Sequence, residues 1–209
     1  MAGFPSPFSR ADDDPFDAYD EFVPDHVPAP GAFLAGHDVL TDGAHVAFHA
    51  LTRDLFEERG VYDMTFGYNL ARLNLDRRHP SAGYRYAEEA DDRTVLRAEF
   101  TPTTPFCPQS HTLAIGSFRA WNGLSDRHEY DLVRVRVHEM HHRAGEINEE
   151  LERLEAAYAE TGSVEGAADD SPGASHAPGA SHAPGASHAP RTPRDEPRSG
   201  ADRGGDAPF

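Results

Sequence analysis

The sequence predicts an α/β fold, a small two-layer sandwich of about three strands with helices packed on one face. A central block of about 120 residues, long enough for one hydrophobic core, carries apolar residues at both helical and strand spacing. The sequence on either side has neither pattern and is rich in proline and polar residues. We therefore expect a flexible acidic arm over residues 1–36, a folded domain over residues 37–160 and a disordered low-complexity tail over residues 161–209.

The helices of this block are predicted from apolar residues that recur every three or four positions. This spacing occurs in residues 43–59, 109–124 and 143–158. Gly60 suits the position just after the first helix, where the backbone turns left-handed.

The strands are predicted from alternating apolar and polar residues, at residues 70–75, 94–100 and 132–137. In the last segment three valines alternate with Arg134 and Arg136, which we assign to a solvated face. Residues 76–92 are expected to form a polar loop. The resulting order is helix, strand, strand, helix, strand, helix, which is typical of helices packed on one sheet.

The charge of the chain excludes several classes of function. The 36 acidic residues outnumber 19 basic ones, all of them Arg, and give a net charge of −17. Such an acidic surface repels phosphate, so we expect no nucleic-acid partner. Arg in place of Lys in so acidic a chain suggests a salt-adapted, halophilic cytoplasm. No run approaches the roughly 20 apolar residues of a membrane span, and the first residues lack the features of a secretory signal, so we expect a cytoplasmic protein without a membrane partner.

The tail contains the unit Pro-Gly-Ala-Ser-His-Ala three times, starting at Pro172, Pro178 and Pro184. Such a segment buries too little apolar surface to offset its chain entropy. We expect its three histidines to belong to a flexible tail rather than to a strong metal site.

The single cysteine of the chain, Cys107, follows the second predicted strand in the segment Thr101-Pro102-Thr103-Thr104-Pro105-Phe106-Cys107-Pro108. One cysteine excludes an intrachain disulfide. Pro108 fits the first position of the next helix. A thiol at a helix entry meets unpaired backbone N–H groups and the positive end of the helix dipole, which favour the reactive thiolate. The alternative is a small buried cysteine that only fills space.

The Thr-Pro-Thr-x-Pro-x-Cys segment, built here from Thr101, Thr103, Pro105 and Cys107, resembles the MIP18 family, also called DUF59. This chain is similar to a divergent, haloarchaeal-type member of that family, which includes SufT-like iron–sulfur cluster assembly proteins. The resemblance implies the MIP18-like fold and makes Cys107 the functional thiol. In this interpretation the two threonines fix the approach to the thiol by hydrogen bonding.

A second match lies upstream, where the family has Asp-Pro-Glu-x-Gly-x-Asn. The chain keeps Asp63, Gly67 and Asn69 of that motif, and the resemblance implies that Asp63 and Asn69 shape a turn facing the thiol. A weaker match is Asn148 with Leu151 in the last helix. Pro-Glu is replaced here by Met64 and Thr65, which removes the family's carboxylate.

A competing motif follows the last predicted strand, where the sequence His138-Glu139-Met140-His141-His142 contains His-Glu-x-x-His. On one helix His138 and His142 would bind zinc, with Glu139 as the base of a metallopeptidase. The extended metallopeptidase pattern then fails, because Asn148 occupies the position of the third ligand. A non-catalytic metal site that uses His138, His141 or His142 is a further alternative.

The sequence thus predicts an iron–sulfur cluster assembly or transfer factor, a carrier or adaptor without enzymatic turnover. One cysteine cannot complete a cluster's ligand set, since four are usual. The missing ligands for a transient cluster, iron or zinc would come from a partner, a second copy in a homodimer, small thiols or the three histidines. The expected partners are the iron–sulfur assembly machinery or client apo-proteins. The main alternative is a partner-binding module that kept the fold and lost the cluster chemistry.

Overall fold

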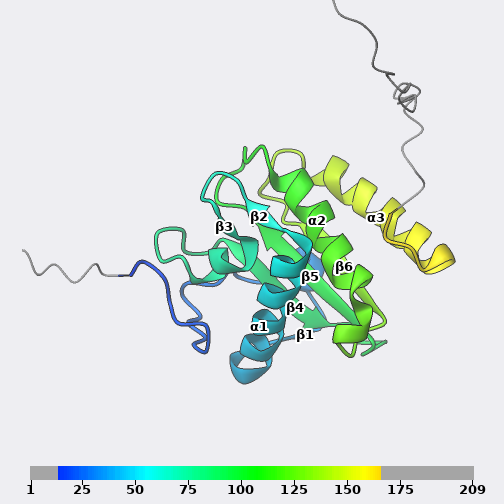
Figure 1. Ribbon diagram of the computed structural model, residues 1–209, viewed down its shortest axis with the longest axis horizontal. Coiled ribbons are helices and arrows are strands. Elements are labelled where there is room, and N and C mark those ends of the chain that lie inside the picture. Colours follow the sequence, from blue (N-terminus) through cyan, green and yellow to red (C-terminus); the bar gives the residue numbers. More distant parts are fainter. Residues whose placement is uncertain (1–13, 166–209) are drawn as a thin grey trace, which may run out of the picture. The chain divides into compact units, whose positions relative to one another are not determined.

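The structure is a computed structural model and describes residues 14–165 (Figure 1). The His-containing repeats lie outside these residues. A four-stranded sheet has the order β1-β4-β5-β6. Its strands are β1 (Asp38–Val39), β4 (Gly83–Glu88), β5 (Val95–Thr101) and β6 (Leu132–Val137). The predicted α/β fold is confirmed, with one strand more in the sheet than the sequence suggested.

Three helices and a small hairpin complete the fold. The helices are α1 (Asp42–Arg59), α2 (Ser110–Gly123) and α3 (Ala144–Thr161). The hairpin pairs β2 (Tyr62–Asp63) with β3 (Tyr68–Asn69). Short 3-10 helices are η1 (Ala32–Leu34), η2 (Leu70–Leu75) and η3 (Ser125–Arg127). No helix within the described residues is long and apolar enough to cross a membrane.

The hydrophobic core lies between one face of the sheet and helices α1 and α2. Tyr84 and Tyr86 stack on that face, and Trp121 of α2 meets the ring of Tyr84 edge-on at 5.0 Å. The indole N–H of Trp121 donates to the hydroxyl of Thr52 in α1, 3.2 Å away. Aromatic rings therefore join both helices to the sheet, and α3 packs beside the edge strand β6.

Strands β5 and β6 are parallel and are connected through α2. Parallel neighbours need such a crossover, since a short turn can join only antiparallel strands. As a result the carboxyl ends of both strands lie at the same edge of the sheet. The segments that follow them, residues 102–109 and 138–143, therefore meet there although they are far apart in the sequence.

The prediction of a flexible arm over residues 1–36 differs from the structure, which places residues 14–36 against the domain. The backbone N–H of Asp17 donates to the carbonyl of Leu75 at 2.7 Å. Further along, the ring of Phe33 lies under the guanidinium groups of Arg97 and Arg136. These aromatic and backbone contacts are non-local, so the proline-rich composition of the segment did not reveal them.

Strand β4 lies inside the segment that was expected to be a polar loop. The strand is buried on both faces, because Tyr84 and Tyr86 enter the core while Arg85 and Ala87 are buried on the opposite face. The charged residues before and after it concealed the short alternating pattern. The expected strand at residues 70–75 is instead the 3-10 helix η2.

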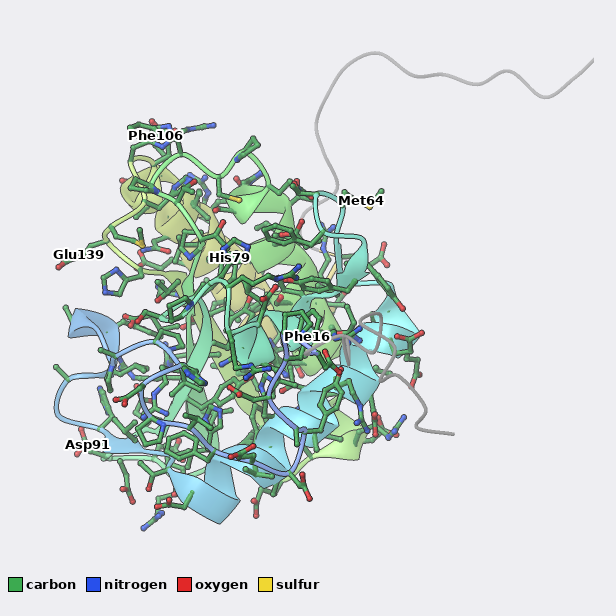
Figure 2. All side chains as sticks on the ribbon, turned by 90° about the vertical axis from the view of Figure 1, so that its left-hand side faces the viewer. Phe16, Met64, His79, Asp91, Phe106 and Glu139 are labelled. Atoms are coloured by element: carbon green, nitrogen blue, oxygen red, sulfur yellow. The ribbon has the colours of Figure 1, made fainter. Side chains whose placement is uncertain are left out.

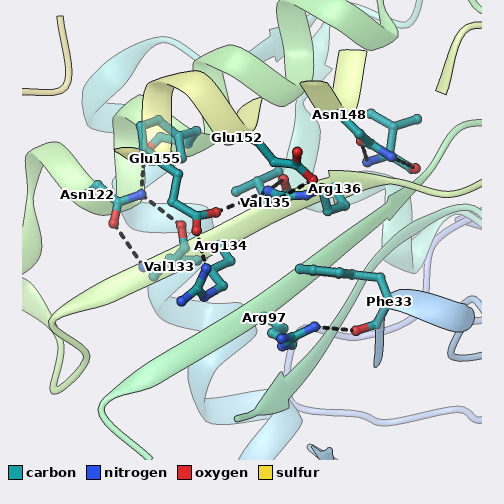
Figure 3. Close-up of polar contacts among 12 residues, drawn as sticks. Phe33, Arg97, Asn122, Val133, Arg134, Val135, Arg136, Asn148, Glu152 and Glu155 are labelled. Carbon is teal, nitrogen blue, oxygen red and sulfur yellow. Dashed lines mark hydrogen bonds and ion pairs between the residues drawn. The ribbon is translucent and has the colours of Figure 1, made fainter. Parts of the chain in front are cut away.

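The prediction of a solvated face for Arg134 and Arg136 is also wrong. Figure 3 shows Glu155 of α3 reaching both guanidinium groups. Arg136 is buried and lies 3.1 Å from Oε2 of Glu155. Helix α3 flanks the edge strand, so it supplies apolar side chains to the core and this carboxylate to the arginines.

Candidate functional site

Three segments meet at the edge of the sheet where β5 and β6 end. They are the cysteine loop (residues 102–109), the histidine loop (residues 138–143) and the hairpin turn between β2 and β3 (residues 64–67). The backbone N–H of His142 donates to the carbonyl of Pro105 at 3.0 Å, which joins the first two. The backbone N–H of Met64 donates to Oε1 of Gln109 at 3.0 Å, which joins the turn to the cysteine loop.

Cys107 is half-buried in the cysteine loop, two residues before Gln109, the N-cap of α2. Helix α2 begins at Ser110, so Pro108 lies in the turn before the helix and not at its first position. The N–H of Ser110 donates to the carbonyl of Cys107 at 3.3 Å. The thiol is thus at the helix entry, as expected, but this first N–H of the helix is paired with the backbone of the cysteine and not with its sulfur.

The segment containing His-Glu-x-x-His forms successive turns, and α3 begins only at Ala144. His138 and His142 are therefore not one turn apart on a helix, as a zinc peptidase motif requires. The N–H of Met140 donates to Nδ1 of His138 at 3.1 Å, which closes the first of these turns. Within residues 14–165 no group of three or more His, Cys, Asp or Glu side chains is arranged to hold a metal ion.

Two histidines of this loop hold the cysteine loop by its backbone. Nε2 of His141 donates to the carbonyl of Cys107 at 3.1 Å, while its Nδ1 accepts from the N–H of Arg143 at 3.3 Å. Nδ1 of His142 donates to the carbonyl of Pro105 at 2.8 Å. Both ring nitrogens of His141 are thus occupied. His142 keeps Nε2 free of hydrogen bonds to the described residues.

Asp63 shapes the hairpin turn, which the hydrogen bond from Met64 to Gln109 joins to the cysteine loop. Its Oδ1 accepts from the N–H groups of Thr65 at 2.7 Å and Phe66 at 3.1 Å. Gly67 completes the turn with a φ of 71°, in the left-handed region that favours glycine. Sequence reasoning missed Gln109, whose Nε2 donates to Oγ1 of Thr65 at 2.6 Å. Only the long-range contact identifies it, since a glutamine before a helix carries no signal of its own.

The side chains of Asn69 and Asn148 hydrogen-bond backbone groups and connect elements of the fold. Asn69 accepts from the N–H of Ala71 at 3.0 Å and donates to the carbonyl of Arg53 at 2.8 Å, so it joins η2 to α1. Asn148 bonds both the N–H and the carbonyl of Val137, at 2.7 and 3.0 Å. It therefore fixes the end of β6 just before the histidine loop.

A family model described as "Domain of unknown function (DUF7998)" matches residues 14–165, well over half of the chain. The chain belongs to this family. No curated protein and no solved structure matches the sequence. The matched residues of the DUF7998 domain coincide with those that the structure describes, and they include the segment 14–36 that packs on the sheet.

Two large apolar side chains of the DUF7998 domain are exposed on segments that meet at this edge of the sheet. Met64 in the hairpin turn is 81% exposed and Phe106 in the cysteine loop is 71% exposed. Figure 2 shows both at the same end of the domain. The ring of Phe106 rests on that of His142, with centroids 5.0 Å apart. Met64 and Phe106 lie on opposite sides of this end in Figure 2, so they are two separate exposed apolar side chains and not one contiguous patch.

Thr101 and Thr103 do not make the hydrogen bonds that were expected to fix the approach to the thiol. Within the described residues neither hydroxyl is hydrogen-bonded to Cys107. Both threonines instead line an open pocket of about 310 Å³, together with His79 and His138. Cys107 does not line this pocket.

Proposed function

We propose that this protein is a cytoplasmic carrier that binds iron or an iron–sulfur cluster through the thiol of Cys107 and passes it to another protein. The observation that carries the proposal is the position of this half-buried cysteine, where the cysteine loop, the histidine loop and the hairpin turn meet. The choice of iron or an iron–sulfur cluster as the cargo rests on the motif resemblance to the MIP18 family. The paired loops supply a rigid setting for the sulfur.

The carrier provides one thiolate and requires ligands from elsewhere. Four cysteine ligands are usual for a cluster, and Cys107 is the single cysteine of the chain. His142 has a ring nitrogen free of hydrogen bonds to the described residues and lies beside the cysteine loop. A partner protein or a small thiol completes the set. Incomplete coordination suits transfer, because the receiving protein can replace the temporary ligands.

The exposed Met64 and Phe106 support docking of a client protein at this end of the domain. They also favour the second candidate function, a partner-binding module without cluster chemistry. The two candidates differ in one property, since only the carrier needs the sulfur of Cys107. Phe106 serves both functions, because burying it contributes to partner affinity in either case.

Anaerobic reconstitution with iron and sulfide tests the carrier. Wild-type protein and Cys107→Ser are reconstituted at high salt, and bound iron and the visible absorption spectrum are measured. We expect the wild type to hold iron and Cys107→Ser to lose it. The control Phe106→Ser keeps the thiol and should retain iron while binding client proteins less tightly. If wild type and Cys107→Ser give the same spectrum and hold no iron, the carrier is rejected and the partner-binding module remains.

A further inference from the structure

The pocket that contains Thr101 and Thr103 is formed by four segments that are far apart in the sequence. Its volume is about 310 Å³, near the lower limit of small-molecule sites. It is lined by residues 28–29, 79–82 and 101–103 and by His138 and Met140. The pocket therefore lies beyond the carboxyl ends of β5 and β6, the position where sheets with parallel strands commonly bind ligands.

The polar side chains of this pocket are hydrogen-bond donors without a formal negative charge. They are the hydroxyls of Ser81, Thr101 and Thr103 and the rings of His79 and His138. No Asp, Glu, Lys or Arg lines the pocket, although the chain has 36 acidic residues. The lining residues themselves therefore place no carboxylate against an anion, although the buried carboxyl group of Glu99 lies close to the ring of His138.

The hydroxyl of Thr101 is a second observation in favour of a ligand, separate from the charge of the lining residues. Thr101 is only 8% exposed, and its hydroxyl makes no hydrogen bond to any of the described residues, but the hydroxyl oxygen is not itself sealed from solvent. The hydroxyl is therefore accessible from the pocket that Thr101 lines, and it has a hydrogen-bond donor to offer to a ligand there. His138 is held in one orientation, because its Nδ1 accepts the N–H of Met140. Its neutral ring then carries the proton on Nε2 and donates from there.

We propose that this pocket binds the oxyanion group of a small metabolite, a phosphate or a carboxylate, through Thr101, Thr103 and the neighbouring imidazoles. The rest of the ligand packs on apolar lining residues, which include Pro102 and Met140. The net charge of −17 opposes an anion only at a distance, and at about 1 M salt charges farther than about 3 Å are screened. This site is separate from Cys107 and does not depend on the carrier function.

Titration with three potassium salts tests the site and distinguishes the sources of the oxyanion. Inorganic phosphate, glycerol phosphate and malate are added to the full chain at constant ionic strength, and binding is measured by calorimetry and by amide chemical shifts. We expect saturable binding of at least one of them, with the largest shifts at Thr101 and Thr103. If phosphate and glycerol phosphate bind and malate does not, the group is a phosphate; the reverse result indicates a carboxylate.

Thr101→Val removes the hydroxyl and keeps the shape of the side chain, so it should weaken the binding by about tenfold or more. Thr104→Val is the matched control, because Thr104 is exposed in the same loop and does not line the pocket. If Thr101→Val fails to fold, Thr103→Val at its half-buried position gives the same comparison. Cys107→Ser should bind the anion as the wild type does. The proposal is overturned if none of the three anions saturates the wild type, or if the threonine variants bind as tightly as Thr104→Val.

Discussion

The Nε2 atom of His141 lies 3.1 Å from the backbone carbonyl oxygen of Cys107 and donates a hydrogen bond to it. This contact joins the cysteine loop to the histidine loop across 34 positions of sequence. His141 is buried, and its other ring nitrogen accepts from the backbone of Arg143. The histidine is therefore a brace for the segment that carries the thiol.

Replacing this brace should loosen the cysteine loop. We expect His141→Phe, which keeps a buried ring but makes neither hydrogen bond, to lower the free energy of unfolding by about 1–3 kcal/mol. It should also raise the rate at which a disulfide reagent modifies Cys107, because the loop opens more often. Chemical unfolding and thiol-modification kinetics measure the two effects. His111→Phe is the control at an exposed position of α2, and an unchanged modification rate in His141→Phe would show that the brace does not restrain the thiol.

The carboxylate of Glu155 stabilises two arginines of β6. Its Oε2 lies 3.1 Å from Nη1 of Arg136, and its Oε1 pairs with Arg134 (Figure 3). Removing Glu155 leaves the buried Arg136 with only the exposed Glu152 as an acidic partner among the described residues, and Arg134 with Glu89 at 3.6 Å, so both lose their closest compensating charge. We expect Glu155→Ala to lower the free energy of unfolding by about 2–4 kcal/mol.

Glu152→Ala provides a matched control one helical turn away. Glu152 is exposed and reaches Arg136 at 3.4 Å, so its loss should cost less than about 1 kcal/mol. Denaturant unfolding of both variants at the same salt concentration gives the comparison. Equal effects of the two substitutions would mean that burial of the Glu155 pair does not matter.

Local sequence patterns predicted those elements whose periodicity is uninterrupted. The predicted helix at 109–124 and strand at 132–137 agree with α2 and β6 to within one residue. Strand β4 was missed because burial on both faces, including that of Arg85, is decided by distant segments. Turns were predicted at both the cysteine loop and the segment 61–69, whereas the pairing of β2 with β3 was not.

The contact between these segments could not be predicted from local sequence patterns. It depends on the parallel pairing of β5 and β6, on Gln109 and on the hydrogen bond from His141 to Cys107. The three histidines after β6 were expected as metal ligands from their residue type. Their hydrogen bonds to backbone groups become visible only when both loops are placed together.

The stability of the domain should fall in acid because two histidines of α1 are buried. Burial lowers the pKa of His45 to about 3 and that of His49 to about 4. In the unfolded chain both titrate near their ordinary value of 6.5. Below that pH both histidines are protonated in the unfolded state but stay neutral in the folded state. The free energy of unfolding is therefore at its full value above pH 6.5 and decreases as the pH falls toward the folded pKa values.

The slope of this loss reaches about 1.4 kcal/mol per pH unit for each histidine. His45→Phe should reduce it, because Nδ1 of His45 has no hydrogen-bond partner among the described residues and its neighbours include the aromatic rings of Phe22 and Tyr86. Unfolding free energies at pH 7.5, 6, 5 and 4.5 measure the slope. A His45→Phe variant as acid-sensitive as the wild type would assign the pH dependence to other groups.

Gly31 secures the segment of residues 14–36 to the sheet because it has no side chain. Its N–H donates to Oε1 of Glu99 at 2.7 Å. A Cβ at this position would lie 2.5 Å from that oxygen and 2.7 Å from Cδ2 of His138. Glu99 is buried, which raises the pKa of its carboxyl group. The carboxyl group therefore cannot move aside without losing its hydrogen bond from Gly31.

We expect Gly31→Ala to lower the free energy of unfolding by about 1–3 kcal/mol, the usual cost of overpacking, and to speed hydrogen exchange in residues 14–36. Gly145→Ala is the control in α3, where a Cβ would meet nothing within 4 Å. That substitution should leave stability unchanged or raise it by up to about 1 kcal/mol, since alanine favours a helix over glycine. Equal stability of the two variants would mean that the segment yields to a methyl group, and its packing against Glu99 would then not secure it to the sheet.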